Sequence, residues 1–326
     1  MNICVAGAGA WGTALANLLC QNGHHVTLWV HDTSRLEELR QTRINQRYLP
    51  DILLPANLSV TGQLPEAAKN CECLVLAVPS KAFRQVTSQL PNFSGVAVSV
   101  TKGIEYDTGL TMSGILEQTM PRATAAALSG PTLAFEVARD VPAAAVVACA
   151  KADVAQKVQS LFTRPTFRVY SSTDLAGVEL GGAIKNVIAI AAGVSDGIGL
   201  GDNAKAALVT RAIVEIRRLG VACGANGETF AGLSGLGDLV VTCFSKLSRN
   251  RAFGERIGRG EAIGQILSSS VTVAEGYPTA RSAFQLARKL SVETPILDEV
   301  HALLYEGKHA REAVHDLMAR DSKPEV

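Results

Sequence analysis

The fold of this chain is decided by the stretch Ile3-Cys4-Val5-Ala6-Gly7-Ala8-Gly9-Ala10-Trp11-Gly12. A short apolar run, which predicts a strand, leads directly into glycines spaced as G-x-G-x-x-G, and residues 13–21 then predict a helix. Gly7 allows the tight turn, Gly9 lets the backbone approach a phosphate, and Gly12 lets the helix pack close to the strand. The spacing alone is weak because glycine is common, but its position between a strand and a helix predicts a site for a dinucleotide pyrophosphate.

Continuous apolar runs recur through the first half of the chain. They lie at residues 26–30, 74–78, 96–100, 125–128 and 143–147, and helical patterns fall at 32–40, 81–90, 111–119 and 152–162. Runs that are continuous rather than alternating are typical of strands covered on both faces. We therefore predict a Rossmann-like α/β domain, with a doubly wound and mostly parallel sheet.

The pattern changes after about residue 175, where strand-like runs become rare. Helices are expected at 181–194, 204–219, 251–259, 279–290 and 295–305. Thr294 is a candidate N-cap for the last of these, with Pro295 at the first helical position. We predict a dinucleotide-binding domain over residues 1–178 and a mostly α-helical substrate and catalytic domain over residues 179–326.

Composition narrows the classes of protein. The formal net charge of +1 gives no bulk attraction to nucleic acid or to an anionic membrane surface. Seven scattered cysteines, an odd number, predict free thiols in a reducing compartment, and hence a cytoplasmic protein with no metal site. The N-terminus has no signal-peptide pattern, and the most apolar stretch, residues 184–194, is expected to be too short to insert into a membrane.

The end of the second strand bears on the choice of dinucleotide. An NAD-specific fold carries a carboxylate about 20 residues beyond the glycine loop, where it binds the ribose. That position falls at His31 here, with Asp32 and Arg35 following. Because a neutral or cationic side chain tolerates a ribose 2′-phosphate, the sequence slightly favours NADP, with NAD also accepted.

Two lysines stand where ligand chemistry is expected. Lys185 lies inside an apolar helical run, so it either extends its ammonium to the surface or serves as a general acid–base with a lowered pKa. Lys102 follows a predicted sheet strand, and the carboxyl ends of such strands bind ligands.

A third group of polar residues lies in the second half. Asp238 is able to pair with or orient a catalytic lysine. Ser248, Arg249 and Asn250 supply donors suited to a phosphate, although the same residues also fit the exposed, basic start of a helix.

Together these motifs resemble the bacterial NAD(P)-dependent sn-glycerol-3-phosphate dehydrogenases, from Ile3 to about Leu317. The matching stretches are Gly7-Ala8-Gly9-Ala10-Trp11-Gly12-Thr13-Ala14, Ala77-Val78-Pro79-Ser80, Thr101-Lys102-Gly103-Ile104-Glu105, Ser129-Gly130-Pro131-Thr132, Gly181-Gly182-Ala183-Ile184-Lys185-Asn186-Val187-Ile188-Ala189-Ile190, Ser195-Asp196-Gly197, Gly235-Leu236-Gly237-Asp238-Leu239, Ser248-Arg249-Asn250-Arg251 and Val273-Ala274-Glu275-Gly276-Tyr277. Each motif is moderately specific, and their order and spacing together are much more so.

The resemblance implies an oxidoreductase that interconverts sn-glycerol 3-phosphate and dihydroxyacetone phosphate with NAD(P)H and supplies phospholipid synthesis. It implies Lys185 as the general acid–base, with Lys102 and Asp238 also catalytic. Implied cofactor contacts are Gly7, Gly9, Ala10, Trp11, Gly12, His31, Lys102, Ala134, Arg249, Val273 and Glu275. Implied substrate contacts are Lys102, Gly130, Thr132, Lys185, Asp238, Ser248, Arg249 and Asn250, with Asn186 and Thr242 as further polar contacts.

Two departures and three alternatives accompany this interpretation. Ala10 and His31 stand where the family often has serine and arginine; the first removes a hydroxyl contact and the second weakens the preference for NADP. The alternatives are a dehydrogenase of β-hydroxy acids, a non-catalytic NAD(P)-sensing protein, and a helical domain that serves mainly to form a homodimer.

Overall fold

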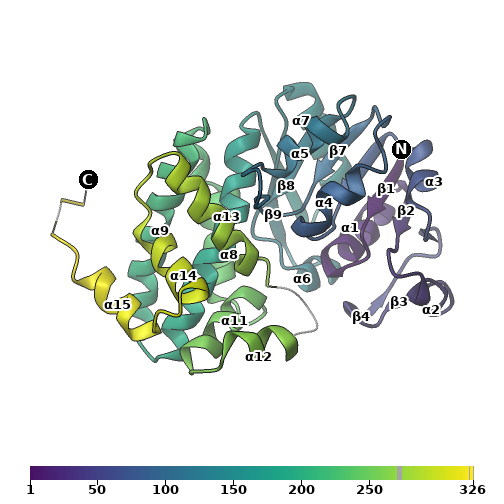
Figure 1. Cartoon of the computed structure of the whole chain (residues 1–326). Helices are drawn as coiled ribbons and strands as arrows, with labels where there is room; N and C mark the ends of the chain where they lie inside the picture. The colour runs from purple at the N-terminus through teal and green to yellow at the C-terminus, as the bar shows by residue number, and fades with distance from the viewer. Residues whose placement is uncertain (270–273, 323, 326) are drawn as a thin grey trace. The chain divides into compact units, whose positions relative to one another are not determined.

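The computed structural model describes residues 1–269, 274–322 and 324–325 (Figure 1). The chain divides into two compact units. The first consists of Met1–Glu105 and Leu110–Glu179, and the second of Tyr106–Gly109 and Leu180–Val326. One division point lies inside a single long helix, α8 (Leu175–Gly197).

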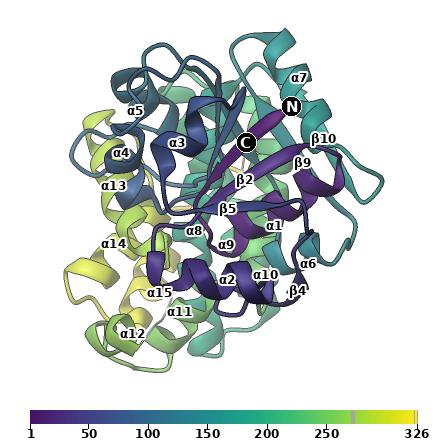
Figure 2. The ribbon, with the colours of Figure 1, turned by 90° about the vertical axis from the view of Figure 1, so that its right-hand side faces the viewer.

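The first unit is built on an eight-stranded sheet in the order β10-β9-β8-β7-β6-β1-β2-β5. Its strands are β1 (Asn2–Ala6), β2 (His25–Trp29), β5 (Ser59–Thr61), β6 (Cys73–Leu76), β7 (Val96–Ser99), β8 (Thr124–Ser129), β9 (Ala143–Ala148) and β10 (Phe167–Ser172). Every neighbouring pair is parallel except β8 and β9. This confirms the predicted mostly parallel α/β fold, and Figure 2 shows β2 beside β5 at one edge.

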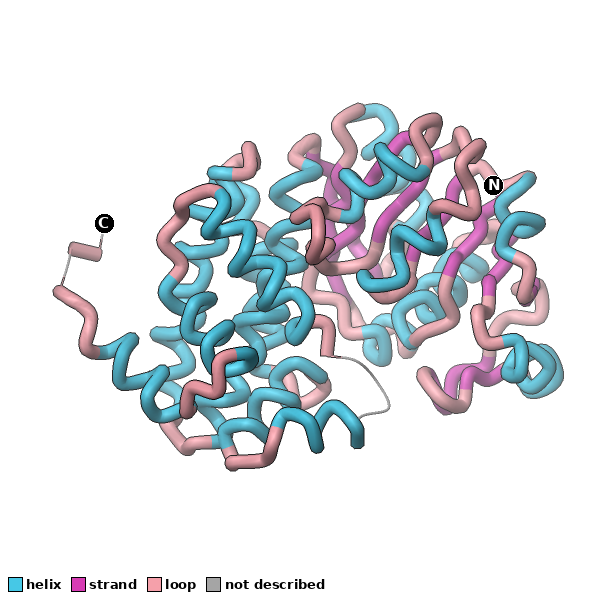
Figure 3. The backbone as a smooth tube through the Cα atoms, in the orientation of Figure 1, coloured by secondary structure: helices cyan, strands magenta, loops and turns pink. Residues whose placement is uncertain are grey.

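The strands bury both faces of the sheet. Ile3 and Val5 of β1 point into one apolar cluster, whereas Cys4 and Ala6 point into another. Helices connect the strands and cover both faces (Figure 3). They are α1 (Ala10–Gln21), α2 (Leu36–Thr42), α3 (Leu64–Lys69), α4 (Ser80–Thr87), α5 (Met112–Thr119), α6 (Ala134–Ala138) and α7 (Ala152–Phe162). Burial on both faces is why the sequence shows continuous apolar runs.

Some elements of this unit were not predicted. The edge strands β5 and β10 and the short hairpin of β3 (Ile44–Asn45) and β4 (Leu49–Leu53) carry too few consecutive apolar residues. The helix expected at 32–40 is instead a 3₁₀ turn, Thr33–Arg35, followed by α2. Asp32 caps that turn by accepting a hydrogen bond from the backbone N–H of Ser34.

The second unit is helical in the part that the structure describes. After α8 come α9 (Asp202–Ala222), α10 (Asp238–Phe244), α11 (Arg249–Gly258), α12 (Ile263–Ser269), α13 (Gly276–Lys289), α14 (Pro295–Tyr305) and α15 (Ala310–Met318). Residues 184–194 were expected to be too short to insert into a membrane. They belong to α8, which has 23 residues and is long and apolar enough to cross a membrane, so the expectation about length was wrong. Its most apolar window is, however, 83% buried inside the protein, as in the core helix of a soluble fold.

The cap of α14 also differs from the prediction. Thr294 occupies the N-cap position, but its hydroxyl contacts the Asp298 carboxylate at 3.3 Å instead of capping a backbone N–H. Glu215 of α9 caps the helix by accepting from the N–H groups of Ile296 and Leu297, at 2.9 and 3.3 Å. Burial raises the pKa of this carboxyl to about 7.

Candidate functional site

The glycine loop joins β1 to α1 in the first unit. Gly7 has a φ of +118°, and a Cβ there would lie 2.6 Å from the carbonyl oxygen of Ala77. A Cβ on Gly12 would lie 1.9 Å from the Gly7 carbonyl oxygen, so the first turn of α1 rests directly on the loop. Both positions therefore require glycine.

The open side of this loop is at Gly9. It is the N-cap residue of α1 and has no atom within 4 Å of an added Cβ. Ala10 and Trp11 form the first turn of the helix, whose leading N–H groups have no partner within the helix. A glycine beside a helix N-terminus leaves room and donors for a phosphate, so these residues fit a dinucleotide.

A residue that the sequence analysis missed braces the loop. The side-chain amide of buried Asn45 donates to the Ala8 carbonyl oxygen at 2.9 Å and to the Thr13 hydroxyl at 2.8 Å. Its own oxygen accepts from the Arg35 guanidinium at 2.7 Å. Asn45 lies in a hairpin without an apolar signature, so no local sequence signal indicated it.

Predicted site residues also gather where β7 and β8 end. The Lys102 ammonium donates to the Gly130 carbonyl oxygen at 3.2 Å, and the Thr132 hydroxyl donates to the same oxygen at 3.1 Å. Gly130 has a φ of +142° and packs against Ala145. Ala134 begins α6 just beyond. The structure thus brings Lys102, Gly130 and Thr132 together at the carboxyl ends of two strands.

His31 stands at the end of β2, where the cofactor ribose was expected. Its side chain is exposed, with the ring centroid 5.6 Å from that of Trp29. The Asp32 carboxylate is engaged by the Ser34 hydroxyl at 2.5 Å as well as by the Ser34 N–H. The Asp32 carboxylate, the nearest to His31 in the sequence, is therefore hydrogen bonded within its own turn.

The second unit buries a lysine against an aspartate. Lys185, on α8, donates from Nζ to Asp238 Oδ1 at 2.5 Å and to Thr242 Oγ1 at 2.7 Å. Asp238 and Thr242 lie one turn apart on α10, and the Thr242 hydroxyl donates to the Asp238 carbonyl oxygen at 2.6 Å. Asp238 is 1% exposed and Lys185 is 7% exposed. The lysine therefore does not extend to the surface, and the pairing with Asp238 expected from the sequence is present.

A chain of amide hydrogen bonds starts at the next residue. Asn250 Nδ2 donates to Asn186 Oδ1 at 2.8 Å, and Asn250 Oδ1 accepts from the Gly276 N–H at 2.8 Å. All three groups are buried. These bonds link α8, the start of α11 and the start of α13, so Asn250 also holds three segments together.

The start of α11 is a helix cap with one exposed cation. Ser248 is the N-cap, and its hydroxyl oxygen accepts from the Arg251 N–H at 3.2 Å. Arg249, at the first helical position, is exposed. Glu275 is the N-cap residue of α13, whereas Val273 lies outside the described residues.

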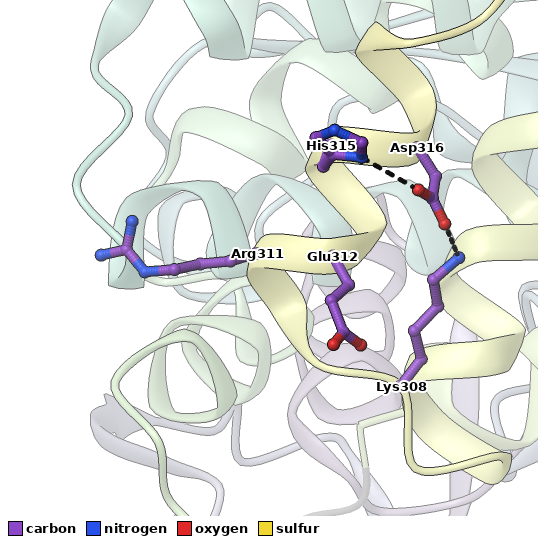
Figure 4. A pocket seen from close by; sticks show the side chains of 5 residues that line it. All are labelled: Lys308, Arg311, Glu312, His315 and Asp316. Atoms are coloured by element: carbon purple, nitrogen blue, oxygen red, sulfur yellow. Dashed lines mark hydrogen bonds and ion pairs between the residues drawn. The ribbon is translucent and has the colours of Figure 1, made fainter.

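Other features of the described residues do not contribute to this chemistry. No group of three or more His, Cys, Asp or Glu side chains gathers as a metal site in the described part of the chain. The seven cysteines are free thiols. A surface hollow along α15 is lined by Lys308, Arg311, Glu312, His315 and Asp316, none of them a predicted site residue (Figure 4). Its dashed contacts join Lys308, Asp316 and His315 into a surface ion-pair cluster.

Comparison with known proteins shows the family. The family model described as NAD-dependent glycerol-3-phosphate dehydrogenase N-terminus matches residues 2–155, and the corresponding C-terminus model matches residues 174–315. A glycerol-3-phosphate dehydrogenase [NAD(P)+] from Geobacter sp. (strain M21) is 50% identical, over 99% of this chain and 98% of that protein.

Solved structures agree with this assignment. Glycerol-3-phosphate dehydrogenase from Coxiella burnetii has a TM-score of 0.94 and 35% identity, covering 98% of each chain. A PanE/ApbA family ketopantoate reductase from Ralstonia eutropha JMP134, with 15% identity and a TM-score of 0.60 over 97% of this chain and 100% of that one, shares the fold alone. The fold is thus common to dehydrogenases with different substrates, whereas the full-length identity is specific. This chain belongs to the NAD-dependent glycerol-3-phosphate dehydrogenase family.

Proposed function

We propose that this chain interconverts sn-glycerol 3-phosphate and dihydroxyacetone phosphate, with NAD(P)H as the hydride donor and NAD(P)+ as the acceptor. The observation that carries the proposal is the buried Lys185–Asp238–Thr242 cluster, because a carbonyl reduction needs a proton donor held in a fixed direction. Family membership supports the choice of substrate. The reaction is expected to supply glycerol 3-phosphate for phospholipid synthesis.

The proton chemistry follows from the cluster. When bound, the nicotinamide supplies or accepts the hydride at the substrate C2. Lys185 gives its proton to the carbonyl oxygen during reduction and takes it back during oxidation. The carboxylate of Asp238 and the hydroxyl of Thr242 each accept a hydrogen bond from the ammonium, so its position is fixed before the substrate arrives. Asp238 also stabilises the charged form of Lys185 during oxidation.

The phosphate is assigned to the start of α11. Arg249 is exposed at the first turn of a ten-residue helix, and Ser248 precedes it as the N-cap. A guanidinium and the positive end of a helix together favour a dianionic phosphate. Asn250 is assigned there as well; its Nδ2 donates to Asn186 and so holds the first turn of α11 in place.

The dinucleotide is assigned to the first unit. Gly7, Gly9 and Gly12 admit the pyrophosphate, with Ala10, Trp11, Lys102 and Ala134 as further contacts, and with His31 toward the ribose. Arg249, Glu275 and Val273 are assigned as cofactor contacts from the second unit's sequence. NADP is slightly favoured over NAD, because His31 is exposed and the Asp32 carboxylate is already engaged by Ser34.

A homodimer in the cytoplasm completes the proposal. One side of α10 and the turn before it presents Leu236, Val240 and Phe244 to solvent, each at least 40% exposed, and Leu247 is 57% exposed. An apolar stripe of this kind is suited to contact with a second copy. Sedimentation at micromolar concentration should give twice the 34.3 kDa mass of the chain.

The decisive assay follows absorbance at the nicotinamide band with the purified chain. We expect oxidation of NADPH and NADH with dihydroxyacetone phosphate, and a higher kcat/KM with NADPH. Turnover with 3-oxo acids but not with dihydroxyacetone phosphate would instead support a β-hydroxy-acid dehydrogenase. Cofactor binding without turnover of either substrate would support a sensor. A strong preference for NADH would contradict only the preference for NADP that is inferred from His31.

A further inference from the structure

The backbone just before Asp238 has an unusual helical turn. Residues Leu233–Gly237 form a single π-turn, in which the N–H of Gly237 donates to the carbonyl oxygen of Gly232 at 3.1 Å. The turn runs without a break into α10, which begins at Asp238. A π-turn inserts one extra residue into a helix, which weakens its hydrogen bonding and rotates everything that follows. A π-turn is therefore expected where the changed direction of the following residues serves a function.

The π-turn packs backbone to backbone against α8. A Cβ added to Gly181 would lie 2.7 Å from the carbonyl oxygen of Ser234 and 3.3 Å from Cα of Gly235. Gly235 is equally constrained, because its added Cβ would lie 2.2 Å from the carbonyl oxygen of Phe230. Glycine at position 181 thus sets how closely α8 and the π-turn approach each other.

This contact lies four residues before each partner of the Lys185–Asp238 hydrogen bond. Gly181 precedes Lys185 by four residues on α8, and Ser234 precedes Asp238 by four residues. Since residues four apart share a face of an α-helix, Gly181 and Lys185 lie on the same side of α8, and the π-turn separates Ser234 from Asp238 on the other segment. The close approach at Gly181 and the 2.5 Å hydrogen bond therefore join the same two segments.

We propose that Gly181 and the π-turn Leu233–Gly237 are positioning elements, which set the distance and direction from Lys185 Nζ to the Asp238 carboxylate. The proposal rests on the proposed function, in which Lys185 is the acid–base group. It assigns a role to residues that do not touch the substrate. The π-turn rotates the Asp238 carboxylate toward Lys185, and the missing Cβ at position 181 brings the two segments close enough to hydrogen bond.

A matched glycine contact lies at the other end of α8. A Cβ on Gly258 of α11 would lie 2.5 Å from the carbonyl oxygen of Val194, a clash of nearly the same size as the one at Gly181. Gly258 is the last residue of α11 and is not a site residue. Alanine at Gly258 therefore imposes similar strain on the same helix without altering the approach of Lys185 to Asp238.

The test compares the kinetics of Gly181→Ala with those of Gly258→Ala. The rate of each variant is divided by its folded fraction, which is measured by circular dichroism at the assay temperature. The extra methyl must displace the backbone by about half an ångström, and displacements of this order in a catalytic group reduce turnover by about tenfold to hundredfold. We expect this loss in kcat for Gly181→Ala, with KM for NADPH unchanged. Gly258→Ala should melt at a similarly lowered temperature but keep kcat within about threefold.

A double-mutant cycle separates positioning from a general structural effect. If Gly181 acts through Lys185, adding Gly181→Ala to Lys185→Ala should not lower the residual rate further. Deletion of exposed Leu236 should convert the π-turn to α-helix, rotate Asp238 away and lower kcat per folded protein about hundredfold.

The outcomes are distinguishable from failure of the function itself. Equal kcat losses in Gly181→Ala and Gly258→Ala, additive losses in the cycle, or full activity after deletion of Leu236 would each overturn the positioning role. So would a Gly181→Ala chain that cannot fold at any temperature, because the contact would then be a folding determinant. Full turnover by Lys185→Ala would instead refute the proposed acid–base role.

Discussion

Among the described residues of the second unit, two lysine–aspartate pairs with buried lysines look alike but differ in their surroundings. Lys185 contacts Asp238 at 2.5 Å, and Lys205 of α9 contacts Asp196 of α8 at 2.5 Å. Both lysine side chains are 9% exposed. A buried ion pair is costly to desolvate, so each needs either a structural or a functional reason.

The carboxylates distinguish the two pairs. Asp196 also receives the Arg251 guanidinium at 2.6 Å, and Arg251 continues to Glu255 at 3.3 Å, so charges alternate from α9 through α8 to α11. The Lys185 ammonium instead contacts Asp238 and a neutral group, the Thr242 hydroxyl, and Asp238 directly follows a π-turn. The first arrangement links three helices, whereas the second holds one ammonium in a chosen direction. Burial and distance alone therefore do not identify a catalytic lysine.

The largest expected effect tests the functional pair. Lys185→Ala should lower kcat by about 10⁴-fold, because a positioned acid–base contributes up to that factor. Cofactor binding, followed by quenching of tryptophan fluorescence by NADPH, should be retained. The matched variant Lys205→Met should lower the melting temperature but keep kcat per folded protein. If the two variants had the same kinetic effect, the distinction between the pairs would be lost.

The second prediction concerns the structural pair. Asp196→Asn leaves the buried Lys205 ammonium without its counter-charge and removes one of the two carboxylates that pair with half-buried Arg251, which should lower the free energy of unfolding by about 3 kcal/mol. Urea unfolding monitored by circular dichroism measures this loss. Asp316→Asn is the control, since that aspartate joins a similar but exposed cluster with Lys308 and should have no measurable effect. Equal stability of Asp196→Asn and the parent chain would show that the network is not structural.

A buried carboxylate held by backbone N–H groups instead of a lysine sharpens the comparison further. Glu215 accepts hydrogen bonds from backbone N–H groups of α14, and burial raises its pKa from 4.5 to about 7. Between these values the folded protein holds a proton that the unfolded chain has lost, so the free energy of unfolding falls as the pH rises through this window. The fall should be about 3 kcal/mol between pH 4.5 and 8.

Glu215→Gln mimics the protonated form and should remove that dependence. The difference between the two chains in urea unfolding at pH 5 and pH 8 isolates this residue from other titrating groups. Parallel pH profiles in the two chains would show that the carboxyl is charged in the folded state across the whole range.

The sequence predicted those elements whose residues are buried on both sides. The runs around Val5 and Val98 belong to interior parallel strands, whereas β10, with alternating burial at one edge, has no comparable run. Helix α10 was missed because the preceding stretch from Gly232 to Gly237 contains glycines that favour a loop, although tertiary packing makes it a π-turn. Local pattern thus predicts an element only when local burial determines it.

The candidate site divides in the same way. The glycine loop was predictable because its spacing is local, and Lys185 stood out because a lysine inside an apolar helical run is costly to bury. Asp238 was a possible partner, and the roles of both residues came from the family resemblance. Asn45, which braces the loop, and Arg251, which pairs with Asp196, depend on partners far away in the sequence. Contacts of this kind are determined by the tertiary fold, so no motif indicates them.

The smallest expected effect separates two arginines on the same turn of α11. Arg251 is half-buried and paired with Asp196, whereas Arg249 is exposed and assigned to the substrate phosphate. Arg249→Ala should raise KM for dihydroxyacetone phosphate by about tenfold to hundredfold and lower kcat less, with an unchanged melting temperature. Added inorganic phosphate should inhibit the parent chain competitively and the variant more weakly. An unchanged KM would move the phosphate away from Arg249, and a lowered melting temperature would place Arg249 with Arg251 in the structural network.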